Sequence, residues 1–256
     1  MRVLAVGDSY LSASVMRAGL EHLGGIELEV LQIDEERVLD PRTTSERRIR
    51  EYVGTPTEIA RHLDSVEVLL VHGAPVTEEL LTAAQSLRLV GCARGGPVNV
   101  DVEAAARLDI PVVGTPGKNA EAVADEAIAL MVMVARGFRR ALRRAESEVP
   151  TGASAFEGAD LMGHELGGLV LGLVGHGQVG RRVATRAAAF GMQVLAHDPF
   201  SPPGPDDVAE PVGELNELLA RSDVVSLHAR ATPDTENLVR DETLGQMRDG
   251  AILINT

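Results

Sequence analysis

Apolar and polar residues follow one another in blocks that predict strands alternating with helices. Short apolar runs, closed by glycine, proline or polar residues, predict strands at 2–6, 26–33, 68–71, 89–93, 110–113, 169–174, 193–196, 223–227 and 251–254. Segments of helical spacing or composition predict helices at 12–23, 43–52, 57–63, 77–87, 102–108, 181–190, 214–221 and 241–247. Strands that alternate with helices pair in parallel, so the pattern predicts an α/β protein.

The same pattern divides the chain into two parts. The first five predicted strands end near Thr115, and a second series begins at residue 169. A chain of 256 residues is long enough for two ordinary domains. We therefore predict two doubly wound parallel-sheet domains, at residues 1–115 and 116–256.

One long helix is predicted from residue 119 to about residue 146. Between residues 120 and 135 it is apolar nearly all round. A helix of this kind is buried on several sides, so we expect it between domains or in a subunit interface, and we predict a homodimer. The small and polar residues at 150–158 predict a loop that leads to the next strand.

The most informative stretch is Leu169–Gly180, which reads LVLGLVGHGQVG. A buried strand runs into a GxGxxG turn formed by Gly175, Gly177 and Gly180, and a helix follows. The first glycine makes the tight turn, the second lets the backbone approach a pyrophosphate, and the third lets the helix pack close to the strand. This order predicts a dinucleotide site in which the helix N-terminus faces the phosphates.

A carboxylate follows the next predicted strand. Asp198 lies eighteen residues after Gly180, where an acidic residue accepts hydrogen bonds from the adenosine ribose of NAD. The same charge would repel the 2′-phosphate of NADP, so we predict NAD as the cofactor. The alternative is an ordinary turn with an aspartate on the surface.

Charge and cysteine content narrow the classes of partner. The net charge of −14 argues against nucleic acid or an anionic membrane. Cys92 is the only cysteine, which excludes an internal disulfide and suits a reducing cytoplasm; we interpret it as a small core residue. The first residues predict neither a signal peptide nor a membrane span, and the seven histidines show no metal-ligand spacing.

Six segments resemble the D-isomer-specific 2-hydroxyacid dehydrogenases, the family of phosphoglycerate, glycerate and formate dehydrogenases. They are RGGPVNVDVEAA (94–105), IPVVGTPGKNAEAVADEAIAL (110–130), LGGLVLGLVGHGQVGRRVA (166–184), VLAHDP (194–199), LLARSDVVSLHARATPDTENLV (218–239) and MRDGAILINT (247–256). The resemblance implies a flavodoxin-like substrate domain followed by a Rossmann NAD-binding domain. It further implies an NAD-dependent oxidoreductase acting on a small 2-hydroxy or 2-oxo acid.

The resemblance also implies roles for individual residues. On the cofactor side these are Gly175, Gly177, Gln178, Val179, Gly180, Asp198, His228, Ala229 and Thr256. On the substrate side they are Arg94, Gly95 and Gly96, a loop that cradles the carboxylate, and His72. His72 either contacts the substrate or packs its loop, and we interpret His228 as a contact at a strand end rather than a catalytic group.

Arg94 departs from the family pattern, which has a small residue there. Its planar fork suits a carboxylate, phosphate or phosphonate, so we hypothesise a substrate with a second anionic group. The alternative is that Arg94 neutralises a nearby acidic residue. Arg230 likewise stands where the family has proline.

In the family, an arginine and a Glu–His acid–base pair follow the position of Thr256. We therefore expect the catalytic residues beyond Thr256 and interpret the sequence as incomplete. One alternative is an NAD(H)-sensing protein, similar to a corepressor, without turnover. Another is a structural α/β protein with a vestigial glycine turn.

Overall fold

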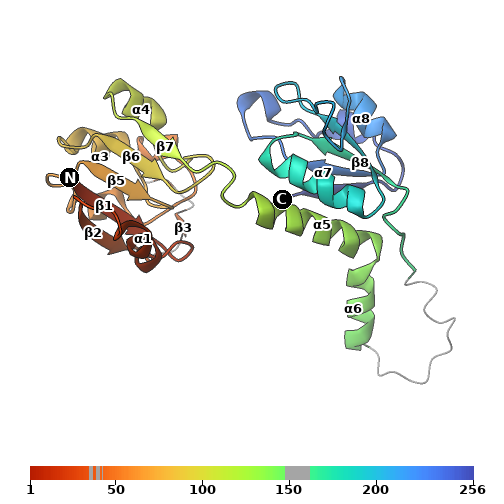
Figure 1. Cartoon of the computed structure of the whole chain (residues 1–256), viewed down its shortest axis with the longest axis horizontal. Helices are drawn as coiled ribbons and strands as arrows, with labels where there is room; N and C mark the ends of the chain where they lie inside the picture. The colour runs from red at the N-terminus through yellow and green to blue at the C-terminus, as the bar shows by residue number, and fades with distance from the viewer. Residues whose placement is uncertain (35–36, 39–40, 42, 148–161) are drawn as a thin grey trace. The chain divides into compact units, whose positions relative to one another are not determined.

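The computed structural model describes residues 1–34, 37–38, 41, 43–147 and 162–256. The chain forms two compact units, Met1–Lys118 and Asn119–Thr256 (Figure 1). Each unit is built on a five-stranded sheet in which every pair of neighbouring strands is parallel. The predicted α/β class with two parallel sheets is confirmed. The loop predicted at 150–158 lies outside the described residues.

The first sheet has the strand order β2-β1-β5-β6-β7. Its strands are β1 (Arg2–Gly7), β2 (Glu27–Gln32), β5 (Val68–Val71), β6 (Leu89–Cys92) and β7 (Val112–Gly114). The helices of this unit are α1 (Ala13–Leu20), α2 (Pro56–Ala60), α3 (Glu78–Ala83) and α4 (Val102–Arg107). Each helix begins at a side chain that accepts a backbone N–H, namely Ser12, Thr55, Thr77 and Asp101.

The position of β1 creates a switch point in this sheet. From β1 the chain passes to β2 on one side and later to β5 on the other. The loops that leave the carboxyl ends of β1 and β5 therefore diverge. Open α/β sheets bind ligands at such a point. The core beneath it is aliphatic and includes the fully buried Leu4 and Leu69.

The second sheet has the order β10-β9-β8-β11-β12. Its strands are β8 (Val170–Val174), β9 (Gln193–His197), β10 (Glu210–Pro211), β11 (Val224–Leu227) and β12 (Ile252–Asn255). The helices are α5 (Ala120–Ala135), α6 (Phe138–Ser147), α7 (Gln178–Ala189), α8 (Leu215–Arg221) and α9 (Asp241–Leu244). Here the switch point lies between β8 and β11.

The helix predicted at 119–146 is two helices. Gly137 has a φ of +62°, which ends α5, and α6 turns away from it (Figure 1). The apolar side of α5 packs against α7 and β12 within its own unit, through residues such as Ala127 and Met131. The apolar side of α5, which suggested a domain or subunit interface, is therefore buried by elements of the same unit.

The helix predicted at 43–52 is also wrong. Only a short 3-10 turn forms there, η1 (Glu46–Arg48), followed by β4 (Tyr52–Val53), which pairs antiparallel with β3 (Arg37–Val38). Tyr52 is 2% exposed, and its hydroxyl donates to Glu46 at 3.0 Å. This buried contact between residues six apart does not fit a surface helix, in which neighbours are three or four apart.

Two features are absent from the described part of the chain. It contains no helix long and apolar enough to cross a membrane. Nor does it bring together three or more His, Cys, Asp or Glu side chains that could hold a metal ion.

Candidate functional site

The glycine turn of the second unit joins β8 to α7 at the switch point of its sheet. Gly175 has a φ of +96°, and a Cβ there would lie 2.7 Å from the backbone nitrogen of Ala229. A Cβ on Gly180 would collide with the carbonyl oxygen of Gly175. At Gly177, by contrast, nothing lies within 4 Å of such a Cβ. The fold itself therefore requires Gly175 and Gly180, whereas Gly177 borders open space.

The start of α7 is suited to an anion. Gly177 is the N-cap residue and has no side chain to accept a hydrogen bond from the first turn. The N–H groups of Gln178 and Val179 belong to that turn, so they have no acceptor within the helix. The helix dipole adds partial positive charge at the same end.

Asp198 follows β9 and ties two loops together. One carboxylate oxygen accepts the backbone N–H of His176 in the glycine turn at 2.8 Å. The other accepts the N–H groups of Phe200 and Ser201, both at 2.9 Å. Burial opposes ionisation of Asp198, but these donors outweigh it and lower the pKa. The carboxylate is thus charged at neutral pH and held beside the glycine turn.

The ends of β11 and β12 lie along the same edge of this sheet. His228 follows β11, and its backbone N–H donates to the carbonyl of Val174 at 2.8 Å. Its Nε2 lies 2.9 Å from Ser226 Oγ, and burial lowers its pKa to about 4. His228 is therefore uncharged at neutral pH. Ala229 and Thr256 are exposed at the same edge.

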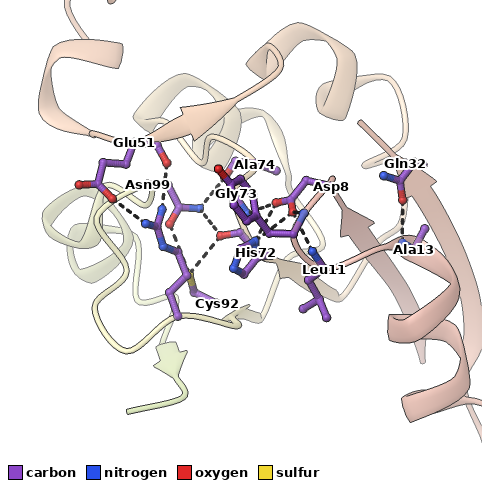
Figure 2. Close-up of polar contacts among 12 residues, drawn as sticks. Asp8, Leu11, Ala13, Gln32, Glu51, His72, Gly73, Ala74, Cys92 and Asn99 are labelled. Atoms are coloured by element: carbon purple, nitrogen blue, oxygen red, sulfur yellow. Dashed lines mark hydrogen bonds and ion pairs between the residues drawn. The ribbon is translucent and has the colours of Figure 1, made fainter. Parts of the chain in front are cut away.

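The first unit carries side-chain pairs at its own switch point (Figure 2). Asp8 follows β1 and His72 follows β5, and His72 Nδ1 lies 2.8 Å from Asp8 Oδ2. The backbone N–H groups of Tyr10, Leu11 and Gly73 also donate to Asp8, at 2.8 to 3.0 Å. Burial opposes ionisation of Asp8, but the hydrogen bonds from His72 and the backbone outweigh it and lower the pKa.

Arg94 leaves the carboxyl end of β6 and is already paired. Its guanidinium donates to the carboxylate of Glu51 at 2.7 Å and to the Glu51 carbonyl at 2.9 Å (Figure 2). Glu51 has a φ of +56°, unusual for a residue with a side chain. Gly95 and Gly96 follow, and no atom lies within 4 Å of a Cβ on Gly96. In this conformation Arg94 therefore neutralises an acidic residue, Glu51, as the alternative interpretation of the sequence expects.

Asn99 fixes the loops around His72 and Arg94. Its amide nitrogen donates to the carbonyl oxygens of His72 and Ala74, at 3.1 and 2.7 Å. The Cys92 thiol lies 3.4 Å from Asn99 Oδ1, and burial raises the pKa of this thiol. Cys92 therefore serves as a core residue under the loops, as the sequence predicts, and not as a thiolate.

Half of the chain matches a known family. Residues 128–256 match the family described as D-isomer specific 2-hydroxyacid dehydrogenase, NAD binding domain. The chain belongs to this family. Its membership confirms the family resemblance of the sequence and the NAD-binding character of the second unit.

Two curated relatives and one solved structure illustrate the similarity. Hydroxypyruvate reductase of Thermotoga maritima is 36% identical over 78% of this chain and 63% of its own length. (S)-Sulfolactate dehydrogenase of Chromohalobacter salexigens is 40% identical over 71% of this chain and 57% of its own length. The TT0316 protein from Thermus thermophilus superimposes with a TM-score of 0.77 at 32% identity, covering 100% of this chain and 73% of that one. The chain thus spans about three fifths of these curated relatives.

The residues of the glycine turn fit NAD. Open space beside Gly177, free N–H groups on the first turn of α7 and a charged Asp198 are what a pyrophosphate and an adjacent ribose require. The structure brings these predicted cofactor residues together at one sheet edge. Their contacts with NAD remain predictions.

Sequence reasoning missed the carboxylates that accompany the substrate-side residues. Asp8 lies 64 positions from His72, and Glu51 lies 43 positions from Arg94. No local motif links residues this far apart. The one signal available was that Asp8 lies in the turn after a predicted strand, two residues beyond its end, while His72 and Arg94 directly follow theirs.

Proposed function

We propose that this chain is the cofactor- and substrate-binding part of an NAD-dependent oxidoreductase that transfers hydride between the nicotinamide and a small 2-hydroxy or 2-oxo acid. The observation that carries the proposal is the glycine turn followed by the charged Asp198, within a chain of this dehydrogenase family. NAD supplies the hydride acceptor, and the residues of this chain supply binding and orientation.

Each candidate residue has a separate task in this proposal. The N–H groups of Gln178 and Val179 bind the pyrophosphate, and Asp198 accepts from the ribose hydroxyls. Neutral His228, with Ala229 and Thr256, lines the edge toward the nicotinamide. His228 acts there as a contact and not as an acid, because its pKa of about 4 leaves it without a proton to give at neutral pH.

On the substrate side, the backbone of Gly95 and Gly96 binds the carboxylate of the acid. A second anionic group, such as phosphate or phosphonate, has to displace Glu51 from Arg94 before Arg94 can bind it. Exchange is feasible because Glu51 is half exposed and exposed ion pairs contribute about 0–1 kcal/mol. The sulfonate in the name of the sulfolactate relative is a group of this kind.

The test is hydride transfer by a purified longer protein that contains this chain together with the arginine, glutamate and histidine expected beyond Thr256. NADH and a 2-oxo acid, either glyoxylate or hydroxypyruvate, are mixed and the loss of NADH fluorescence is followed, with NADPH as the comparison. We expect turnover with NADH in preference to NADPH. Tight NADH binding without turnover of either acid by this longer protein would instead support the NAD(H)-sensing alternative.

We also propose a homodimer, formed around the junction of α5 and α6. Met133, Val134, Phe138 and Leu142 are each more than two fifths exposed there, whereas Ala127, Ile128 and Met131 of α5 are buried within the unit. Contiguous exposed apolar residues of this size are typical of interaction surfaces. Sedimentation of the chain should show a dimer at micromolar concentration, and Phe138→Glu should produce a folded monomer. A monomeric wild-type chain would refute the proposal.

A further inference from the structure

Asp8 and His72 form a buried pair at the switch point of the first sheet. Asp8 is 2% exposed, and four donors converge on its carboxylate, three of them backbone N–H groups. A Cβ on Gly73 would lie 2.7 Å from Asp8 Oδ2, so the glycine permits this close approach. The carboxylate is thus anchored by the loops themselves and offers His72 a fixed acceptor.

This arrangement decides which ring nitrogen of His72 carries the proton. An ionised carboxylate can only accept hydrogen bonds, so the contact with Asp8 requires the hydrogen on Nδ1. Nε2 makes no hydrogen bond to any described residue and is not sealed from solvent. It is therefore the end of the ring available to a ligand, as an acceptor when His72 is neutral and as a donor when it is charged.

The ring is also held in place by its surroundings. Asn99 fixes the carbonyl of His72, and only 14% of the His72 side chain is exposed. The ring of Tyr10 lies 6.2 Å from it, and Tyr10 is 84% exposed. A largely buried imidazole thus presents one nitrogen without a hydrogen bond to the described residues, beside the exposed ring of Tyr10.

We propose that Asp8 is a positioning residue that holds His72 with Nε2 toward the ligand, so that His72 binds an oxygen of the 2-hydroxy or 2-oxo acid. The inference rests on the proposed function for the identity of the ligand. It decides between the two interpretations of His72 in favour of substrate contact. Asp8 acts only through His72 and does not touch the ligand itself.

A second histidine–carboxylate pair in the same unit provides a matched control. His62 Nδ1 lies 2.6 Å from Glu29 Oε1, but both side chains are more than a third exposed. Glu29 lies within β2, away from the carboxyl ends of the strands. Breaking this pair removes a similar contact without touching the switch point.

The first measurement is the tautomer of His72 by nitrogen-15 NMR of the full chain, with the signal assigned through His72→Asn. We expect the proton on Nδ1 in the wild type and loss of this preference in Asp8→Asn, with no change in Glu29→Gln. A wild-type proton on Nε2 would overturn the proposal.

The second measurement is binding of glycolate, with and without NAD, followed by the shift of the His72 ring signals. We expect Asp8→Asn to weaken glycolate binding roughly tenfold, about the value of one hydrogen bond to a charged group. Glu29→Gln should bind as the wild type does. Equal affinity in both variants, or glycolate that leaves His72 unshifted, would contradict a ligand contact.

His72→Asn keeps the test decisive if Asp8→Asn does not fold. It leaves the three backbone hydrogen bonds of Asp8 in place, so we expect near-native thermal stability and weakened glycolate binding. Wild-type affinity in this variant would refute the inference. Glycolate that shifts His72, without any hydride transfer by a longer protein that contains this chain, would refute the proposed function alone. Hydride transfer unaffected by both variants would refute the inference alone.

Discussion

The two switch points of this molecule use different means to prepare for an anion. In the second unit, no side chain caps the first backbone N–H groups of α7, and open space lies beside Gly177. In the first unit, the histidine and arginine side chains at the carboxyl ends of the strands are already engaged by carboxylates, His72 by Asp8 and Arg94 by Glu51. The switch point of the second unit therefore offers backbone N–H groups, whereas that of the first unit offers side chains that are already paired with carboxylates.

The difference follows from what each edge is proposed to bind. A pyrophosphate is the same in every dinucleotide, so backbone groups and a helix dipole suffice. An acid substrate varies in size and charge, and side chains can be exchanged to match it. Carboxylate partners hold such side chains in place without leaving a surplus of charge, which makes the edge selective rather than generally attractive to anions.

The largest effect on stability should come from adding a side chain at Gly180, where the fold leaves no room for one. Gly180→Ala places a Cβ against the Gly175 carbonyl, so we expect a loss of about 2–3 kcal/mol in the free energy of unfolding, measured with urea. Gly177→Ala is the matched control, because its Cβ meets nothing in the protein. It should leave stability unchanged and weaken NADH binding. Equal stability loss in both would erase the distinction between structural and ligand-facing glycines.

The next effect is the pH dependence caused by His228. Its pKa falls from 6.5 to about 4 on folding, so the unfolded chain binds the proton more tightly than the folded chain does. Stability is therefore fully present above pH 6.5 and falls by about 2–3 kcal/mol as the pH drops toward 4. His228→Asn should remove this component, whereas replacing the exposed His22 should not. A parallel pH profile in both variants would contradict this assignment.

Asp198→Ala tests the carboxylate that complements the bare glycine turn. Loss of the charge should weaken NADH binding and relieve the repulsion of NADPH. The ratio of NADH affinity to NADPH affinity should therefore fall about tenfold. The measurement is fluorescence titration with both cofactors. Because Asp198 also ties two loops, thermal unfolding must be measured alongside. Stronger NADPH than NADH binding by the wild type would disprove the basis of this prediction.

The smallest effect is expected at Arg94 and Glu51, whose ion pair is partly exposed. Glu51→Gln should free Arg94 and raise kcat/KM for an acid with a second anionic group by roughly threefold, with little change for glyoxylate. Arg94→Ala should act in the opposite direction. Identical effects on both types of acid would show that this pair does not select a second charge.

The sequence determined the class of fold and located the glycine turn of the second unit. Apolar runs and helical spacing predicted both parallel sheets, because burial imposes these patterns locally. The GxGxxG turn was recognisable because Gly175 and Gly180 stand where the backbone leaves no room for a Cβ. Asp198 was recognisable by its position after the next strand. The sequence-based prediction failed where the local pattern was ambiguous, as for the helix predicted at 43–52 and for the single helix predicted across the break between α5 and α6.

Only the tertiary structure revealed how the first edge is arranged. Asp8 and His72, like Glu51 and Arg94, are far apart in the chain and meet because strands β1, β5 and β6 end at one side of a sheet. Such pairs leave no periodicity in the sequence, since the contact depends on strand order. Likewise, the apolar character of α5 was visible in the sequence, but only packing showed that α7 and β12 cover one side of it, around Ala127 and Met131.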